Sequence, residues 1–302
     1  MTLPPPAAPS PAGQANGGRP ADDRPADGLT AGGGAIGGLA TGGGPGGGRG
    51  RNRVVAVAEI VAEAGPGGVT RLPVLASQAP LVLRRTPSAV YLVGGAAGPL
   101  GGDQLTLRIT VRAGALLRLR TAAAAIALPG LDGLESELRV SAHVAAGGRL
   151  EYLPEPVVVS ARARHATVVS VDLAAEATLL LRDEVLLGRH GEAGGTARSV
   201  LRVSYAGRPL LHQSVTVSGT DEASLGPAVL ARHRAVGMLL HAGGPVATIA
   251  PGAAAGVAVM PLAGPGVLVT ALAGDAVTLR RRLTAPAAPA TGPGVAPARG
   301  PG

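Results

Sequence analysis

The sequence lacks cysteine, phenylalanine, tryptophan and lysine, and it has only three tyrosines among 302 residues. Without cysteine the chain can form no disulfide, no thiolate metal site and no thiol nucleophile. Without lysine it cannot carry a phosphate loop of the Walker type, in which that side chain reaches the nucleotide phosphates. A folded core must therefore be built from valine, leucine, isoleucine and alanine, and nucleotide hydrolysis by that route is excluded.

The positive charge of the chain is not gathered into one segment. The formal net charge is +8, and arginines are spread over short clusters such as 84–85 and 280–282. A nucleic-acid partner would need a clustered basic face with aromatic side chains for base stacking. The sequence therefore predicts no nucleic-acid binding. Much of the excess of alanine, glycine, proline and arginine is typical of a GC-rich coding sequence.

The two ends of the chain differ in composition from its middle. Residues 1–50 are tracts of proline, glycine and alanine with hardly a large apolar side chain, and residues 286–302 are similar. Such segments bury too little apolar surface to offset the entropy lost on ordering. We expect two disordered tails around one folded domain at 51–285. The first residues do not resemble a secretory signal, so a cytoplasmic location is expected.

An uncharged and largely apolar stretch lies between His241 and Asp275. It is long enough to span a bilayer. Prolines interrupt it at Pro245, Pro251, Pro261 and Pro265. A membrane helix scarcely tolerates so many breaks. The sequence therefore predicts short buried strands here and no membrane span.

Alternating apolar residues predict strands in the middle of the chain. From Leu105 to Val111 every second residue is apolar, and threonine or arginine stands between, which is the period of a strand with one buried face. A turn at 113–115 leads to a second alternating strand that ends in alanines. The same strand, turn, strand unit recurs around 146–148 and 175–177, after 33 and then 29 further residues.

Repeats of this kind stack one-sided hairpins so that each covers the apolar face of its neighbour. The expected fold class is all-β, a superhelical or layered body of strand-turn-strand units with one or two helices in the C-terminal half. One amphipathic helix is predicted at 224–241, where the larger apolar residues recur at roughly helical intervals. Strands are expected to resume at about Val246 and at 267–272.

Few side chains point to catalysis or to a permanent metal site. The six histidines show no HExxH or other ligand spacing. The densest polar cluster is Asp183-Glu184, followed by a block from Gly188 to Glu192. Adjacent acids on a strand point to opposite faces, so at most one of the pair faces inward. Two interpretations stay open: a sheet edge solvated by charge, or a carboxylate that lines an interior passage suited to a divalent cation.

Several blocks of the sequence follow one another in the order seen in a known family. They are the Gly-Gly-Asp block at 98–105, the strand pair after it, LEYLPEP at 150–156, the acidic block at 183–192 and GVLVTALA at 266–273. As a set, over about 70–280, they resemble the UreD family of urease accessory proteins, called UreH in some systems. The residues that carry these motifs are Gly101, Gly102, Asp103, Pro154, Gly188 and Arg189.

The resemblance implies a β-superhelical scaffold, without catalysis of its own, for assembly of the nickel centre of urease. It implies binding to the urease apoprotein and to a UreF-like helical protein, which in turn docks a UreG-like GTPase. It also implies no tightly bound cofactor, with nickel in transit through an internal tunnel. The candidate residues for this passage are Asp183, at a position usually acidic in the family, and Glu192. If Asp183 faces inward, Glu184 is expected to be an ordinary surface side chain whose loss is near neutral.

The sequence departs from the family pattern after the second strand of the first repeat. Many relatives carry a polar Gln-Ala-Ala-Thr-Lys run there, whereas this chain has Thr121 followed by the alanines 122–125. That departure argues against any role for a lysine or glutamine at this place, and favours small side chains packed in a narrow interior. Two alternative functions stay open: a β-helical enzyme acting on polysaccharide, for which the stacking aromatics are missing, and a structural β-solenoid.

Deletion of residues 1–50 is expected to leave urease activation intact, because the segment has no apolar pattern to dock and no charge run to steer association. Complementation of a strain that lacks this gene measures the effect. Loss of activation at normal expression would show that the segment binds a partner.

Overall fold

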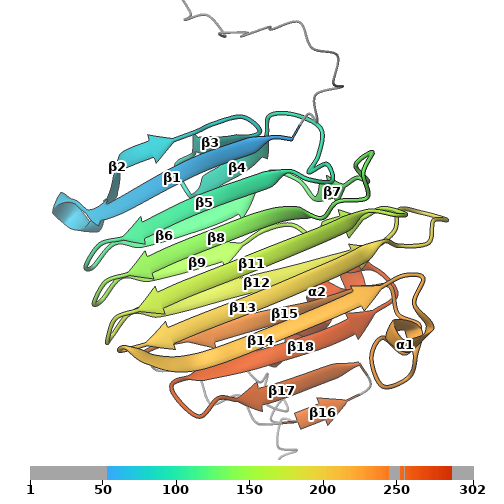
Figure 1. Cartoon of the computed structure of the whole chain (residues 1–302). Coiled ribbons are helices and arrows are strands. Elements are labelled where there is room, and N and C mark those ends of the chain that lie inside the picture. The colour runs from blue at the N-terminus through green and yellow to red at the C-terminus, as the bar shows by residue number, and fades with distance from the viewer. Residues whose placement is uncertain (1–52, 245–251, 255, 288–302) are drawn as a thin grey trace, which may run out of the picture. The chain divides into compact units, whose positions relative to one another are not determined.

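The computed structural model describes residues 53–244, 252–254 and 256–287. The tail expected at 1–50 lies outside these residues, as do the strand expected at about Val246 and all but the first two residues of the tail expected at 286–302. In the described part of the chain, seven strands form one sheet and eleven form a second sheet that faces it (Figure 1).

The seven-stranded sheet has the order β14-β13-β11-β8-β5-β1-β2. Its strands, in chain order, are β1 (Val55–Ala64), β2 (Thr70–Ala76), β5 (Gln104–Val111), β8 (Ser136–Val144), β11 (Arg164–Leu173), β13 (Thr196–Tyr205) and β14 (Arg208–Ser218). The central strands β5, β8, β11 and β13 run parallel to one another, and β14 closes one edge antiparallel.

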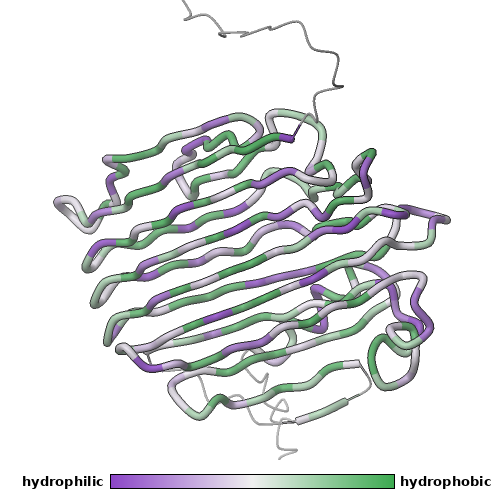
Figure 2. Tube along the Cα trace, viewed as in Figure 1, coloured by the Kyte–Doolittle hydropathy of each residue, from purple (hydrophilic) through white to green (hydrophobic). Residues whose placement is uncertain are grey.

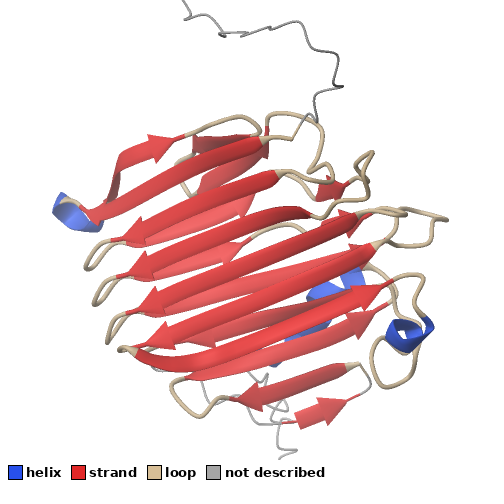
Figure 3. Ribbon diagram, in the orientation of Figure 1, coloured by secondary structure: helices blue, strands red, loops and turns tan. Residues whose placement is uncertain are grey.

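The eleven-stranded sheet has the order β16-β17-β18-β15-β12-β9-β6-β4-β3, and β7 and β10 attach beside β12. Its strands are β3 (Leu81–Arg85), β4 (Val90–Gly94), β6 (Leu116–Thr121), β7 (Ala125–Ala127), β9 (Arg149–Leu153), β10 (Val157–Val159), β12 (Thr178–Leu187), β15 (Ala235–Ala242), β16 (Gly252–Ala254), β17 (Val257–Pro261) and β18 (Gly266–Ala273). The helices are η1 (Pro66–Gly68), α1 (Glu222–Leu225), α2 (Ala276–Thr284) and η2 (Ala285–Ala287). η1 and α1 lie at the margins of the sheets, whereas α2 lies against the outer face of the eleven-stranded sheet (Figure 3).

The predicted repeat is present, and the all-β class is confirmed. Its turns lie at Gly114, Gly147 and Glu176, each with a φ between 64° and 68°. The pairing differs from the expected hairpins, however. The two strands of a unit lie in different sheets, and each pairs in parallel with the equivalent strand of the next unit, as β5 with β8 and β6 with β9. The chain therefore winds as a β-solenoid, because both strands of a unit have one apolar face and those faces can cover each other.

Alternation along each strand builds the core between the sheets. On β5 the residues Leu105, Leu107, Ile109 and Val111 are buried, and those between them are partly or fully exposed. Figure 2 shows the same alternation of apolar and polar residues along neighbouring strands. Most of the core is aliphatic, and Tyr152 on β9 is the buried aromatic residue among those described.

The helix predicted at 224–241 is wrong. Only Glu222–Leu225 form a helix, and 235–242 form strand β15. Asp221 does cap the short helix, because its carboxylate accepts a hydrogen bond from the backbone N–H of Ser224. Strand β15 is buried by the core on one face and by α2 on the other. A strand covered on both faces reads as a continuous apolar run, which periodicity alone does not separate from a helix.

The apolar stretch after β15 forms short strands in its described part, as predicted, but of these β18 is largely buried, β17 is partly exposed and β16 is exposed. β17 and β18 pair antiparallel and extend the eleven-stranded sheet beyond β15, and the strand expected at 267–272 is β18. None of the helices formed by the described residues is long and apolar enough to cross a membrane.

The Gly-Gly-Asp block joins the starts of β1 and β5. Asp103 is 3% exposed, and its carboxylate accepts hydrogen bonds from the backbone N–H groups of Val54 at 3.0 Å and Leu100 at 2.9 Å. A Cβ on Gly101 would lie 2.5 Å from a backbone nitrogen of a neighbouring loop, so no larger residue fits. Gly102 has a φ of 95°, which favours glycine. The Gly-Gly-Asp motif therefore has a structural role.

Asp103→Ala is expected to lower the free energy of unfolding by about 3 kcal/mol, because two backbone N–H groups lose a charged acceptor. Asp103→Asn keeps one acceptor oxygen and should lose less. Urea unfolding of both variants measures the difference. An Asp103→Ala variant within about 0.5 kcal/mol of the wild type, as for an ordinary surface change, would contradict this role.

Candidate functional site

Asp183 lies in the middle of β12 and faces the space between the two sheets. It is 8% exposed, and its Oδ2 accepts a hydrogen bond from the hydroxyl of Ser199 on β13 of the opposite sheet. Burial raises the pKa of this carboxyl, and the Ser199 hydrogen bond opposes that effect in part. The residue is thus an acid held among apolar side chains with a hydroxyl as its hydrogen-bond partner.

Two cavities lie between the sheets, and they meet at Asp183. The larger has a volume of about 560 Å³, and the smaller about 460 Å³. Among the described residues, Asp183 is the one side chain common to both linings. The larger cavity lies toward β3–β10, and the smaller toward β13–β18.

The larger cavity is lined by the charged residues Glu155, Arg182, Asp183 and Arg189 and also by several uncharged polar groups. His165 on β11 places Nδ1 2.9 Å from the Ser136 hydroxyl, and burial lowers the pKa of its imidazole to about 4. Burial and the nearby charge of Asp183 raise the pKa of the Tyr152 phenol. Thr167, next to Ser199 across the β11–β13 pair, also lines this cavity. The imidazole, phenol and hydroxyl therefore provide dipoles and lone pairs without adding net charge.

Small side chains form one wall of the larger cavity. The alanines 122–124 fall between β6 and β7, Ala125 begins β7, and the Pro154–Pro156 break separates β9 from β10. The alanines 122–124 are exposed, so the expectation that they pack in a narrow interior is wrong. The matching part of β12 is continuous and carries Arg182, Asp183 and Glu184. Interrupted strands with short side chains therefore lie beside the uninterrupted strand that carries the acid.

The smaller cavity has hydroxyl and amide groups in an apolar wall. Ser199 and Gln213 contribute from the seven-stranded sheet, and Thr270 and Met238 contribute from the other sheet. In register, Asp183 pairs with Met238, which in turn pairs with Thr270. Polar side chains thus line the smaller cavity as well as the larger one, with Asp183 between them.

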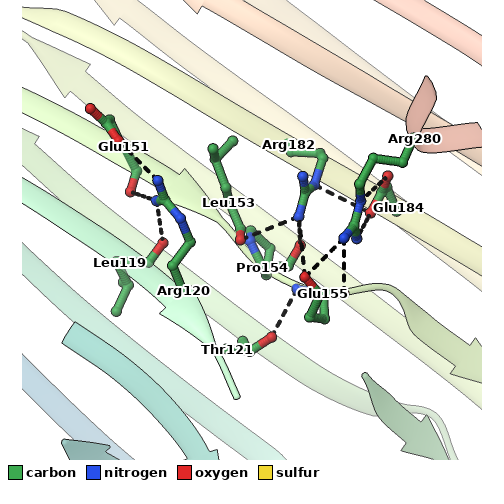
Figure 4. A network of polar contacts seen from close by, with 10 residues as sticks. All are labelled: Leu119, Arg120, Thr121, Glu151, Leu153, Pro154, Glu155, Arg182, Glu184 and Arg280. Carbon is green, nitrogen blue, oxygen red and sulfur yellow. Dashed lines mark hydrogen bonds and ion pairs between the residues drawn. The ribbon is translucent and has the colours of Figure 1, made fainter. Parts of the chain in front are cut away.

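Glu184 points away from Asp183, to the outer face of the sheet, and there it is completely buried. Its carboxylate lies 3.2 Å from Nε of Arg182 and 2.5 Å from Nη2 of Arg280, a residue of α2 (Figure 4). Arg280 also contacts Glu155 at 3.0 Å. The opposite-face prediction is confirmed, but the expectation of a surface glutamate is wrong, because α2 packs over this face and supplies its counter-charge.

Glu192, the second candidate residue, lies in the turn between β12 and β13. Its carboxylate is 2.8 Å from Nε of Arg189 and accepts the Arg189 backbone N–H at 3.0 Å, and these hydrogen bonds lower its pKa to about 2. Gly188 has a positive φ and no room for a Cβ against the backbone of Glu192. Arg189 lines the larger cavity, whereas Glu192 lines neither. The structure places Glu192 in a closed turn, apart from Asp183.

Three important residues were missed from the sequence. Ser199 and Gln213 occupy inward positions of β13 and β14, and the other inward positions of these strands are mostly apolar. Strict alternation along the two strands could therefore have singled them out. Arg280 had no comparable signal, because its partner Glu184 lies 96 residues away in the sequence.

The described residues hold no group of three or more histidine, aspartate or glutamate side chains that could bind a metal ion. The donors at the junction of the cavities are one carboxylate, hydroxyls and an amide. Fold and interior together define a β-solenoid with two cavities that meet at a buried acid.

Comparison with known proteins names the family. The family model described as UreD urease accessory protein matches residues 55–296. The UreD protein of Frankia alni is 45% identical over 281 residues, which covers 80% of this chain and 94% of the relative. The UreD protein of a Parafrankia strain is 44% identical over 270 residues, which covers 80% of this chain and 91% of the relative. The UreD protein of Streptomyces coelicolor is 43% identical over 239 residues, which covers 76% of this chain and 94% of the relative.

The chain belongs to the UreD urease accessory protein family. It is a urease maturation factor, a non-catalytic protein of nickel insertion, as the resemblance implied. The alternatives of a polysaccharide-acting enzyme and of a purely structural solenoid are therefore set aside.

Glu184→Ala is expected to lower the free energy of unfolding by about 3 kcal/mol or more, because it leaves two arginines without their buried counter-charge. Glu151→Ala is the control, since Glu151 pairs with Arg118 and Arg120 on the same face but is partly exposed. Its loss should be below about 1 kcal/mol. Equal urea midpoints for the two variants would contradict a structural role for the Glu184 network.

Proposed function

We propose that this chain passes Ni²⁺ to urease through its interior, with Asp183 as the carboxylate at which the ion crosses from one cavity to the other. The observation that carries the proposal is the position of Asp183 in both linings. Family membership supplies the cargo, and the cavities supply space for the ion with part of its water shell.

The donor set suits transit rather than storage. Tight sites for divalent transition metals combine several imidazole, thiolate or carboxylate ligands in a fixed geometry. Here one carboxylate is accompanied by uncharged oxygen donors such as Ser199 and Thr167. A conducting path needs binding that is favourable enough for entry and weak enough for release. Asp183, a single carboxylate whose hydrogen-bond partner is the neutral Ser199 hydroxyl, meets both conditions.

The charge balance around Asp183 gives it a reason to attract a cation. A buried carboxylate without a counter-charge is costly in its ionised form. Ser199 donates a hydrogen bond, whereas Arg182 and Arg280 are engaged by Glu184 on the other face. A divalent cation beside Asp183 offsets this cost more fully than the neutral hydroxyl of Ser199 does.

The scaffold role requires partners, and we propose those of the family. The urease apoprotein receives the ion, and a UreF-like protein docks a UreG-like GTPase, so that nucleotide hydrolysis belongs to a partner. The complex would act in the cytoplasm without membrane or nucleic acid. Exposed apolar side chains such as Ile126 on β7 and Leu131 in the following loop support a surface made for protein contact.

Asp183→Asn is expected to lower the nickel content of urease about tenfold at limiting nickel, the size of one interaction with a charged group. Asparagine keeps an acceptor for Ser199 but removes the charge. Because burial raises the pKa of Asp183 above its unfolded value, ionisation costs stability as the pH rises through that range, and the variant should be as stable as the wild type or more so.

The matched control is Asp172→Asn. Asp172 on β11 also accepts a hydrogen bond from a serine hydroxyl of β13, that of Ser204, but it lies on the exposed outer face. Nickel per urease active site is measured after co-expression of the full set of proteins, with a pull-down of partners. Normal loading by Asp183→Asn, or an equal loss in both variants, would overturn the proposed route.

A further inference from the structure

One buried acceptor in the smaller cavity has no hydrogen-bond partner in the part of the chain that the structure describes. Among the described residues, three buried side-chain atoms make no hydrogen bond: Arg182 Nε, Gln213 Oε1 and His241 Nε2. Arg182 Nε still has an ion pair with Glu184 at 3.2 Å. His241 alternates with the inward residues of β15 and so faces the outer side of its sheet. Arg182 lines the larger cavity, and Gln213 is the one of the three residues that lines the smaller cavity, which also contains Asp183.

Strand register places Gln213 one step beyond Ser199. Gln213 pairs with Leu201, and Val215 pairs with Ser199, so all four belong to the β13–β14 ladder. Ser199 donates a hydrogen bond to Asp183 from the seven-stranded sheet. Gln213 therefore follows Ser199 along the wall of the smaller cavity, on the side away from the larger one.

We infer that Gln213 is the next oxygen ligand for the ion after Asp183, an uncharged station in the smaller cavity. This inference rests on the proposed function and extends it. A buried amide oxygen without a hydrogen bond costs free energy, and a cation or its bound water removes that cost when it arrives. Amide oxygens are common ligands of divalent cations, and they bind them less tightly than carboxylates do.

The neutrality of Gln213 is part of its role. A second carboxylate beside Asp183 would hold the ion more firmly, whereas an amide lets the ion leave Asp183 without a new charge to bind it. Thr270, on the opposite wall of the same cavity, adds a further hydroxyl. The proposed polar path runs from Thr167 to Asp183 and Ser199, and from there to Gln213 and Thr270.

The test compares Gln213→Leu and Gln213→Glu in the full chain, co-expressed with urease and the other accessory proteins at limiting Ni²⁺. Gln213→Leu removes the oxygen at similar size and is expected to slow nickel loading about tenfold, the effect of one lost interaction with a charged group. Gln213→Glu keeps an oxygen at the same place and should load faster than Gln213→Leu, but more slowly than the wild type because a second carboxylate holds the ion more firmly. The control is Leu211→Met, an inward residue of β14 that lines neither cavity.

A second measurement separates a role of Gln213 in nickel transit from a role in the stability of the fold. Because leucine replaces a buried acceptor that has no partner, Gln213→Leu should not lower the urea midpoint, while its loading falls. Loading that falls together with the midpoint, or that falls equally for the leucine and glutamate variants, overturns the inference and makes Gln213 a packing residue.

The Asp183→Asn variant is measured in parallel. Slow loading by Asp183→Asn with normal loading by Gln213→Leu overturns the inference about Gln213, whose oxygen then holds only a water molecule, and leaves the proposed route standing. Normal loading by Asp183→Asn overturns the route and, with it, any station on that route.

Discussion

Every inward side chain of this protein has to help fill the space between two sheets, and packed sheets lie about 10 Å apart. The sequence has no phenylalanine or tryptophan, so this space is filled mainly by aliphatic groups. Where the inward positions carry serine or threonine, as at Ser199 and Thr167, the side chains of the two sheets do not fill it and cavities persist. The hollow interior follows from composition as much as from topology.

Two neighbouring acids on β12 have opposite roles because strand alternation sends them to opposite faces. Glu184 meets Arg182 and Arg280, which balance its charge and tie α2 to the sheet. Asp183 meets a serine hydroxyl among apolar groups, and burial raises its pKa. The acid with arginine partners ties α2 to the sheet, whereas the acid with a serine partner is the residue at which we propose that the ion crosses. One strand thus supplies both the support for the site and the site itself.

Much of the fold could be predicted from local pattern. The turns at 113–115, 146–148 and 175–177 and the alternation before them indicated the repeat, and the spacing of glycine and aspartate at 101–103 indicated a motif. The helix at 224–241 failed because β15 is covered on both faces. The expectation for Glu184 failed because its cover comes from α2, far along the chain.

The sequence by itself determined that the central repeats form strands, which face of those strands is apolar, where glycine is required and which family the chain belongs to. Only the tertiary structure decided that the strands of each unit separate into two sheets, that Glu184 is buried, and that two cavities meet at Asp183 with Gln213 beyond it. The reason is physical: side-chain alternation is a property of a few consecutive residues, whereas pairing, cover and counter-charge come from segments that meet only when the chain has folded.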